Sequence, residues 1–246
     1  MSGTIDDREI ERFNALAEAW WDVEGDFRPL HMFNPVRLAY IGDKLAAHFG
    51  RNTDDSNPLT GLGLLDVGCG GGLICEPMVR LGANVTGIDA GEKNIQIAAA
   101  HAKSNGLSID YRQTSVEALA KGKERFDVIL NMEVIEHVAD VAGFMAALVE
   151  LTRPGGALLL ATLNRTPRSY FEAILGAEYV LRWLPAGTHD WTRFRKPAEL
   201  GRHLRHAGAE LRDVTGMRYR PRQGEWRLSR DVGVNYLAYA VRPERP

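Results

Sequence analysis

A glycine-rich turn close behind a carboxylate is the first part of this sequence whose residue types suit ligand binding. Residues 64–72 read LLDVGCGGG, and four of the five residues 68–72 lack a side chain. Such backbone can approach a ligand closely, and a turn that leads into a helix suits a flat or anionic group. Dinucleotide dehydrogenases share the pattern, so the turn alone predicts a binding site without naming the ligand.

Two carboxylates and a later turn narrow the choice of ligand. Asp66 stands shortly before the first glycine, where it would bind the ammonium of a methionine moiety and repel a pyrophosphate. Asp89 ends the GID motif and would accept both hydroxyls of an unphosphorylated ribose, which fits either cofactor. An RPGG turn at 153–156 precedes an apolar run, and dehydrogenases do not require such an element. Together these features favour a cationic ligand that contains methionine.

A third polar group, Glu133, Glu136 and His137, follows the fourth apolar run, where open α/β sheets bind ligands. Spacings of three and four would place these residues on one side of a helical turn. Two carboxylates and an imidazole predict a divalent cation site, with Mg²⁺ favoured by oxygen ligands and Zn²⁺ or Mn²⁺ allowed by the imidazole. His137 alone would also suit a general base. A helix-capping or packing role for this turn stays open.

The elements that must position these residues alternate along the chain. Five apolar runs predict strands, at 63–67, 84–88, 108–113, 126–131 and 156–162. Three helical stretches separate them, at 73–81, 92–105 and 141–152. This alternation is typical of parallel βαβ units. With edge strands at 211–215 and 235–241, we expect an α/β fold: a doubly wound, mostly parallel, seven-stranded Rossmann-like sheet.

The flanking segments divide the chain into four expected parts. These are an N-terminal helical appendage that covers the substrate (1–57), a cofactor-binding core (58–163), an insertion after the fifth strand (164–210) and C-terminal strands (211–246). Within the appendage, the sequence predicts one helix over 7–21 and a second helix after Asn34-Pro35, with Asn34 as the N-cap of the second. The later predicted helices cover 167–184 and 197–207.

The order of these motifs resembles that of class I S-adenosylmethionine-dependent methyltransferases. DVGCGGG, GID, FDVILNMEVIEHV and RPGGALLLATLN follow one another over about 100 residues, in the order typical of that family. The resemblance implies that backbone at Gly68 and Gly70 holds the methionine part and that Asp89 holds the ribose. It further implies that Ser115 and Val116 line the adenine edge and that Met132 forms the far wall.

The flanks resemble UbiG-type ubiquinone biosynthesis O-methyltransferases, over nearly the whole chain. The matching runs are WWD at 20–22, PLH at 29–31, NP at 34–35, LNR at 163–165, GTHD at 187–190, KPAEL at 196–200 and VNY at 234–236. The resemblance implies methylation of catechol-type hydroxyls on 2-polyprenyl-6-hydroxyphenol and 3-demethylubiquinol. It implies that Arg37 contacts the cofactor carboxylate, and the eukaryotic relatives favour a metal.

Composition limits the partners. The formal net charge of -2 in 246 residues predicts no nucleic-acid partner, and two cysteines six positions apart favour a reducing compartment. The start of the sequence has charges where a signal peptide has an apolar run, and no long apolar stretch occurs. We therefore expect a cytoplasmic protein, peripheral on the inner face of the cytoplasmic membrane, with a quinone-biosynthesis complex as a further partner.

The insertion is where membrane contact is expected, because a polyprenylated substrate lies in the bilayer. Apolar residues including Tyr170, Phe171 and Ile174 share one helical stripe, and basic residues over 165–196 suit anionic headgroups. A lid helix packed on the core is the alternative. Likewise, Trp20, Trp21 and Phe27 suit either a wall for the substrate ring or core packing.

Three rival functions stay open. A nicotinamide-dependent oxidoreductase shares the glycine turn but needs a hydride site that this sequence does not offer. A methyltransferase acting on carbon or another small phenol shares the first motifs. A non-catalytic lipid-binding member of a quinone-synthesis complex would keep the fold without the chemistry.

Overall fold

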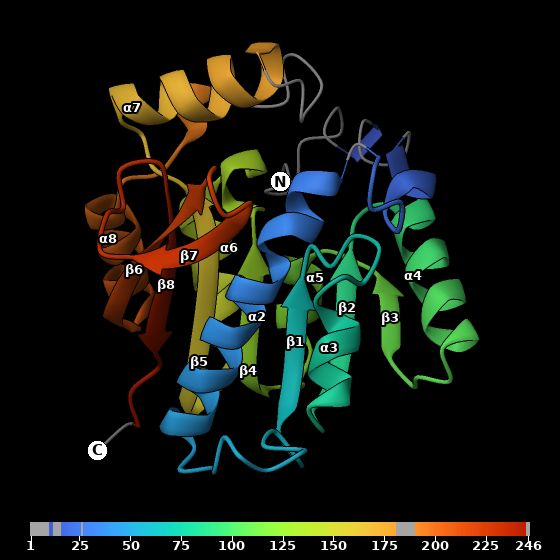
Figure 1. Cartoon of the computed structure of the whole chain (residues 1–246). Coiled ribbons are helices and arrows are strands. Elements are labelled where there is room, and N and C mark those ends of the chain that lie inside the picture. Colours follow the sequence, from blue (N-terminus) through green and yellow to red (C-terminus); the bar gives the residue numbers. More distant parts are fainter. Residues whose placement is uncertain (1–9, 12–15, 26, 181–189, 245–246) are drawn as a thin grey trace.

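The computed structural model describes residues 10–11, 16–25, 27–180 and 190–244. Its centre is one sheet with helices on both faces (Figure 1). The strands are β1 (Gly63–Val67), β2 (Asn84–Asp89), β3 (Asp110–Gln113), β4 (Phe126–Met132), β5 (Thr152–Leu163), β6 (Glu210–Arg220), β7 (Glu225–Ser229) and β8 (Asn235–Val241). Their order is β3-β2-β1-β4-β5-β8-β6-β7, with β1 to β5 parallel and β8, β6 and β7 antiparallel to their neighbours.

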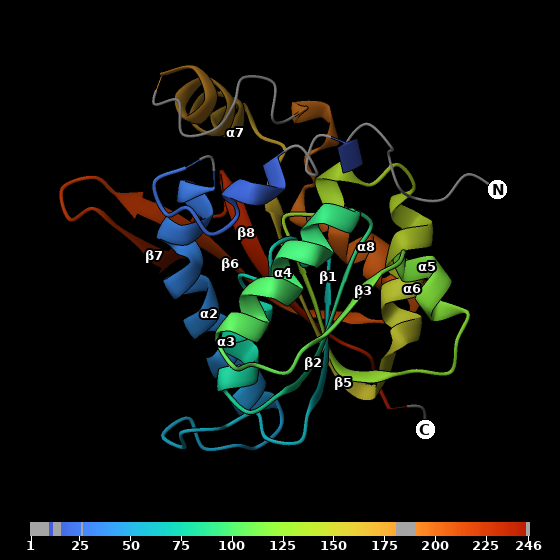
Figure 2. The ribbon, with the colours of Figure 1, turned by 90° about the vertical axis from the view of Figure 1, so that its right-hand side faces the viewer.

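Helices cover the sheet because its central strands are apolar on both faces. The helices are α2 (Arg28–His48), α3 (Cys75–Arg80), α4 (Glu92–Ser104), α5 (Val116–Ala120), α6 (Val141–Leu151) and α8 (Pro197–Ala207). In β1, Leu64 packs in the core with α2 and α3, whereas Leu65 packs in the core with α6 and α8. This alternation is what a strand buried on both faces requires. Figure 2 shows the sheet between these two helical layers.

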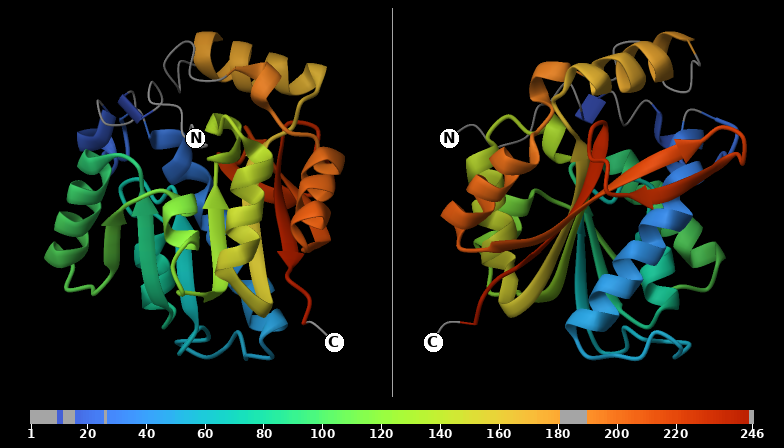
Figure 3. Two further views of the ribbon diagram at one scale, coloured as in Figure 1. Left: turned by 180° about the vertical axis from the view of Figure 1, so that it is seen from behind. Right: turned by 60° about the vertical axis from the view of Figure 1, so that its left-hand side comes forward.

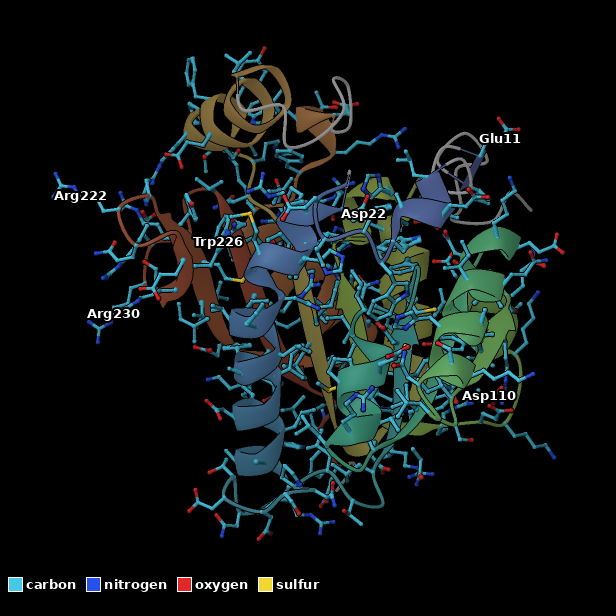
Figure 4. All side chains as sticks on the ribbon, turned by 45° about the vertical axis from the view of Figure 1, so that its right-hand side comes forward. Glu11, Asp22, Asp110, Arg222, Trp226 and Arg230 are labelled. Carbon is cyan, nitrogen blue, oxygen red and sulfur yellow. The ribbon has the colours of Figure 1, made fainter. Side chains whose placement is uncertain are left out.

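The predicted α/β class is confirmed, but the expected strand count was wrong: the sheet has eight strands within the described residues rather than seven. β6 extends to Arg220 and turns back through residues 221–224 into β7. Tyr219 pairs with Trp226 across this hairpin, and Trp226 packs edge-on against Phe33 of α2. Figure 4 shows Trp226 beside α2, with Arg222 and Arg230 pointing away from the domain. The arginines between these aromatics hid the strand pattern in the sequence.

The predicted start of the second helix was also wrong. α2 begins at Arg28, with Pro29 in its first turn, and Pro35 lies inside it. Asn34 is therefore not an N-cap: its side chain is buried and donates to the Leu73 carbonyl at 3.1 Å. Of the first predicted helix, the structure describes residues 10–11 and 16–21, where η1 (Ala17–Ala19) is a 3-10 turn.

The helix of the insertion lies at the end of the molecule at which β1, β2 and β4 terminate, on the side of β5, β6 and β8, as Figures 1 and 3 show from opposite sides. It begins with α7 (Pro167–Ser169), capped by Thr166, and continues as the π-helix η3 (Tyr170–Val180). Residues 181–184 of the predicted helix lie outside the described residues. None of the helices described here has the length and apolar character needed to cross a bilayer.

Candidate functional site

The glycine turn after β1 is held against β2 by backbone hydrogen bonds. The N–H groups of Gly68 and Cys69 both donate to the Ile88 carbonyl, at 2.8 and 3.0 Å. Within the sheet, Asp66 of β1 lies in register with Gly87 of β2 and Leu130 of β4. The order of the parallel strands reverses between β1 and β4. Such a reversal is the position where open parallel sheets bind ligands.

The glycines of this turn have no room for a side chain. Gly68, Gly70 and Gly72 adopt positive φ values of 75, 52 and 88°. A Cβ added at Gly68 would lie 2.4 Å from Val134, and one added at Gly70 would lie 2.4 Å from the Trp20 indole. The turn therefore requires glycine at these positions, and two side chains that the sequence did not connect with the turn cover it.

Asp89 ends β2, and both oxygens of its carboxylate accept hydrogen bonds. Its Oδ1 accepts from the Gly91 N–H at 2.8 Å and from the Asn94 amide at 3.0 Å, and its Oδ2 accepts from the Gly70 N–H at 3.0 Å. Burial raises the pKa of Asp89, and these three donors counteract the increase. The carboxylate is therefore held in one orientation at the edge of the glycine turn.

The residues predicted for the adenine edge lie at the same end of the sheet. Thr114 N–H donates to the Asp89 carbonyl at 3.1 Å, which places the following residue, Ser115, close to the end of β2. Ser115 caps α5 by accepting from the Ala118 N–H, and Val116 is buried. Met132 is buried at the end of β4.

Asp66 and Arg37 are both buried, and each favours the charged form of the other. Burial raises the pKa of Asp66 to about 6, while the Cys75 thiol, which donates at 3.3 Å, and Arg37 oppose the rise. Arg37 is only 3% exposed, and burial lowers its pKa against the opposing effect of Glu133 and Asp66. Its Nε and Nη2 both donate to Asn34 Oδ1, at 3.1 and 2.7 Å. Asn34 therefore orients Arg37. The sequence did not reveal this role, because its pattern predicts Asn34 as the N-cap of the helix.

Glu133 and Glu136 lie together after β4. Glu133 has a left-handed φ of 57°, unusual for a residue with a side chain, and its N–H donates to the Ala161 carbonyl. Glu136 is 2% exposed, and its Oε2 accepts from the Thr162 hydroxyl at 2.8 Å. Burial first, and the neighbouring Glu133 carboxylate second, raise the pKa of Glu136 well above its usual value.

The structure does not assemble the predicted metal triad. His137 ends the 3-10 turn η2 (Ile135–His137), and the strained residue Glu133 precedes that turn instead of sharing one helical face with it. Across the described ranges, no three His, Cys, Asp or Glu side chains are close enough together to hold a metal ion. Spacing alone could not reveal this, because it assumed regular helical geometry at Glu133.

Comparisons with known proteins agree with this geometry. A family model for a methyltransferase domain matches residues 65–160. The chain is similar to ubiquinone biosynthesis O-methyltransferases of Chelativorans sp. (strain BNC1), at 55% identity over 98% of this chain and 95% of that protein, and of Sinorhizobium medicae (strain WSM419), at 54% identity over 98% and 97%. The chain belongs to the ubiquinone biosynthesis O-methyltransferase family.

The predicted enzyme class, an S-adenosylmethionine-dependent O-methyltransferase of ubiquinone biosynthesis, is thereby confirmed. The fold also resembles magnesium protoporphyrin IX methyltransferase from Synechocystis PCC 6803, whose crystal structure has SAH bound. That match has a TM-score of 0.66 and 21% identity, and it covers 96% of this chain and 100% of the other. At this identity the likeness supports the fold alone.

Exchange of Gly70 for alanine tests how tightly the turn is covered. Gly70→Ala should lower the free energy of unfolding by about 2–4 kcal/mol, because left-handed backbone strain adds to overlap with Trp20. Gly106→Ala is the matched control, since Gly106 also has a positive φ but no atom within 4 Å of an added Cβ, and it should lose only about 1 kcal/mol. Urea unfolding measures the free energy of unfolding of both variants. Equal losses in the two variants would contradict the close packing of Trp20 on Gly70.

Proposed function

We propose that this chain moves the methyl group of S-adenosylmethionine to a catechol-type hydroxyl of polyprenylated rings, on 2-polyprenyl-6-hydroxyphenol and 3-demethylubiquinol. The names of its relatives support the ring class. The observation that carries the proposal is the convergence of Asp66, Asp89 and Glu133 at the ends of β1, β2 and β4, around a side-chain-free turn. Carboxylates there suit a cationic cofactor with a free ribose.

The cofactor would lie along the glycine turn. In this proposal Asp89 accepts the ribose hydroxyls, and Asp66 attracts the methionine ammonium directly or through water. Arg37 provides a guanidinium for the methionine carboxylate, and its burial beside Asp66 and Glu133 supports that role. Backbone at Gly68 and Gly70 holds the methionine part. Ser115 and Val116 line the adenine edge, next to the end of β2, and Met132 at the end of β4 forms the far wall.

The chemical demand on the protein is removal of a proton. The sulfonium already provides a good leaving group, so the phenol oxygen needs alignment and deprotonation. A phenol has a pKa of about 10, so at neutral pH about one molecule in a thousand is the nucleophilic phenolate, a deficit of roughly 4 kcal/mol. A base of raised pKa on the protein reduces that deficit.

We assign proton removal to the turn that carries Glu133, Glu136 and His137. The raised pKa of Glu136 makes its carboxylate a stronger base than a surface glutamate, and Thr162 fixes one of its oxygens. The other oxygen, Oε1, is buried without a hydrogen-bond partner among the described residues. His137 on the same turn is the alternative base.

The carboxylates of Glu133 and Glu136 also fit a divalent cation in part. They provide the oxygen donors that Mg²⁺ prefers, and the partnerless Glu136 oxygen is available to such an ion. They offer two donors instead of the three first expected. An ion held by this pair would supply Lewis acidity that lowers the pKa of the catechol hydroxyl.

Product formation tests the function directly. Purified protein incubated with S-adenosylmethionine and a short-chain 2-polyprenyl-6-hydroxyphenol should yield a product heavier by one methyl group, read by mass spectrometry. Loss of product with EDTA and its return with Mg²⁺ would support the ion at Glu133 and Glu136. Product formation indifferent to EDTA would assign deprotonation to protein groups alone. No product, with SAH binding demonstrated by calorimetry, would overturn the proposed substrates in favour of another acceptor or a non-catalytic role.

Exchange of Glu136 for glutamine tests the base. Glu136→Gln should lower kcat by roughly a hundredfold, the usual contribution of a general base, and leave SAH affinity unchanged. Glu76→Gln provides a control, because Glu76 of α3 is a similarly buried carboxylate that pairs with His101 of α4 at 2.6 Å. Its turnover per folded molecule should match that of the parent protein. Unchanged kcat in Glu136→Gln would remove Glu136 from the mechanism.

We propose peripheral contact with the inner face of the cytoplasmic membrane, made by the insertion. Phe171 is 63% exposed and Tyr170 is 42% exposed, on a helix at the end of the molecule where β1 and β2 terminate. Arg165 pairs with Glu199, and Arg168 pairs with Glu172 and Asp231. Because those charges are compensated within the chain, apolar contact should contribute more than attraction to headgroups. A complex with other quinone-synthesis proteins belongs to the same proposal.

Vesicle co-sedimentation tests this contact. Phe171→Glu should reduce binding to vesicles that contain phosphatidylglycerol, since it places a charge where the aromatic ring would enter the interface. Val23→Glu is the matched control, because Val23 is 57% exposed and lies on the N-terminal segment. Equal vesicle binding by Phe171→Glu and the parent protein would contradict contact through the insertion.

A further inference from the structure

The segment over residues 16–25 packs directly on the glycine turn, and none of the roles assigned above uses it. The Trp20 indole lies against Gly70 and Gly71, so closely that a Cβ at either glycine would lie 2.4 Å from it. Its other face stacks on Phe27, with ring centroids 3.9 Å apart and planes 6° from parallel. Trp20 is 8% exposed. The indole is therefore fixed between the turn and a second aromatic ring.

Neighbouring contacts hold this segment in place. Trp21 Nε1 donates to the Gly71 carbonyl at 3.0 Å, and the Trp21 ring stacks on His101 of α4 at 3.5 Å between centroids. The His31 ring, on α2, hydrogen-bonds the Trp20 carbonyl through Nε2 at 2.9 Å. The segment is thus attached to the turn, to α2 and to α4, and the position of Trp20 does not depend on one contact.

A hydrogen-bond relay connects Trp20 to the end of β2. Trp20 Nε1 donates to Asn94 Oδ1 at 2.9 Å, and Asn94 Nδ2 donates to Asp89 Oδ1 at 3.0 Å. Asn94 is 2% exposed, so water does not replace either bond. An indole N–H can only donate, and it therefore requires the oxygen of the Asn94 amide to face Trp20. The NH₂ group of Asn94 must then face the carboxylate of Asp89.

We propose that Trp20 is a positioning residue for ribose recognition: through Asn94 it sets the orientation of the Asp89 carboxylate. Without the indole donor, the Asn94 amide loses the bond that fixes its oxygen, so its Nδ2 no longer holds Asp89 Oδ1 in one orientation. The N-terminal segment thereby becomes part of the cofactor site although it does not touch the reacting atoms. This inference rests on the proposed role of Asp89 toward the ribose.

The test measures affinity for two ligands by calorimetry: SAH and its 2′,3′-dideoxy analogue, which lacks the ribose hydroxyls. Trp20→Phe keeps an aromatic ring on the glycine turn and removes only the N–H donor. It should weaken SAH binding by roughly tenfold and binding of the dideoxy analogue by less than about twofold. Trp191→Phe is the matched control, since it removes an indole bond to the Thr166 carbonyl in the insertion, and it should change neither affinity.

Asn94→Ala provides a second route to the same result. It should show the same selective loss for SAH, and the double variant with Trp20→Phe should lose little more than either single one, because both act on one relay. This variant keeps the proposal testable if Trp20→Phe unfolds, which thermal unfolding would reveal.

Asp89→Asn separates this inference from the one on which it rests. If Asp89→Asn weakens both ligands equally, the ribose role of Asp89 is wrong. A second outcome overturns the positioning role alone. In it, Asp89→Asn weakens binding of SAH more than binding of the dideoxy analogue, whereas Trp20→Phe and Asn94→Ala weaken binding of both ligands equally or leave both unchanged. Selective loss in all three variants supports the relay from Trp20 to the ribose.

Discussion

The cofactor edge depends on two backbone hydrogen bonds that hold the glycine turn to β2. Because Gly68 and Cys69 both donate to the Ile88 carbonyl, the turn cannot move away from the strand that ends in Asp89. The Gly70 N–H then reaches the Asp89 carboxylate. Side-chain-free residues are required for this approach, since neighbouring groups already occupy the space a Cβ would need. Turn and carboxylate form one rigid unit.

Burial of charge connects the N-terminal appendage to that unit. Arg37 comes from α2, yet its charge compensates Asp66 of β1 and Glu133 after β4. An isolated charge at such low exposure would be strongly destabilising, so the three groups depend on one another. Asn34 completes the arrangement by accepting two bonds from the guanidinium and donating to Leu73 behind the turn. α2 therefore covers the site and also provides the positive charge that compensates its carboxylates.

The helix of the insertion is attached to the domain through one ion pair and apolar packing. Arg168 pairs with Asp231 in the loop after β7, and Ile174 packs with Leu163 of β5. Within the insertion, Arg165 pairs with Glu199 of α8. These contacts direct Phe171 and Tyr170 toward solvent at the end of the molecule where the strands terminate. The placement of exposed aromatics at this end of the molecule follows from internal ion pairs that hold the polar side of the helix.

The sequence by itself determined the α/β core and the order of its motifs, because apolar periodicity and glycine spacing are local properties; β1 and α8 begin and end where the pattern predicts. Local pattern could not determine how distant segments meet. The structure alone decided that Asn34 orients Arg37 inside a longer helix, that Glu133 leaves helical geometry and separates the expected metal triad, and that Trp20 lies on the glycine turn. Each of these results from packing or charge compensation between residues far apart in the chain, which no spacing within the sequence encodes.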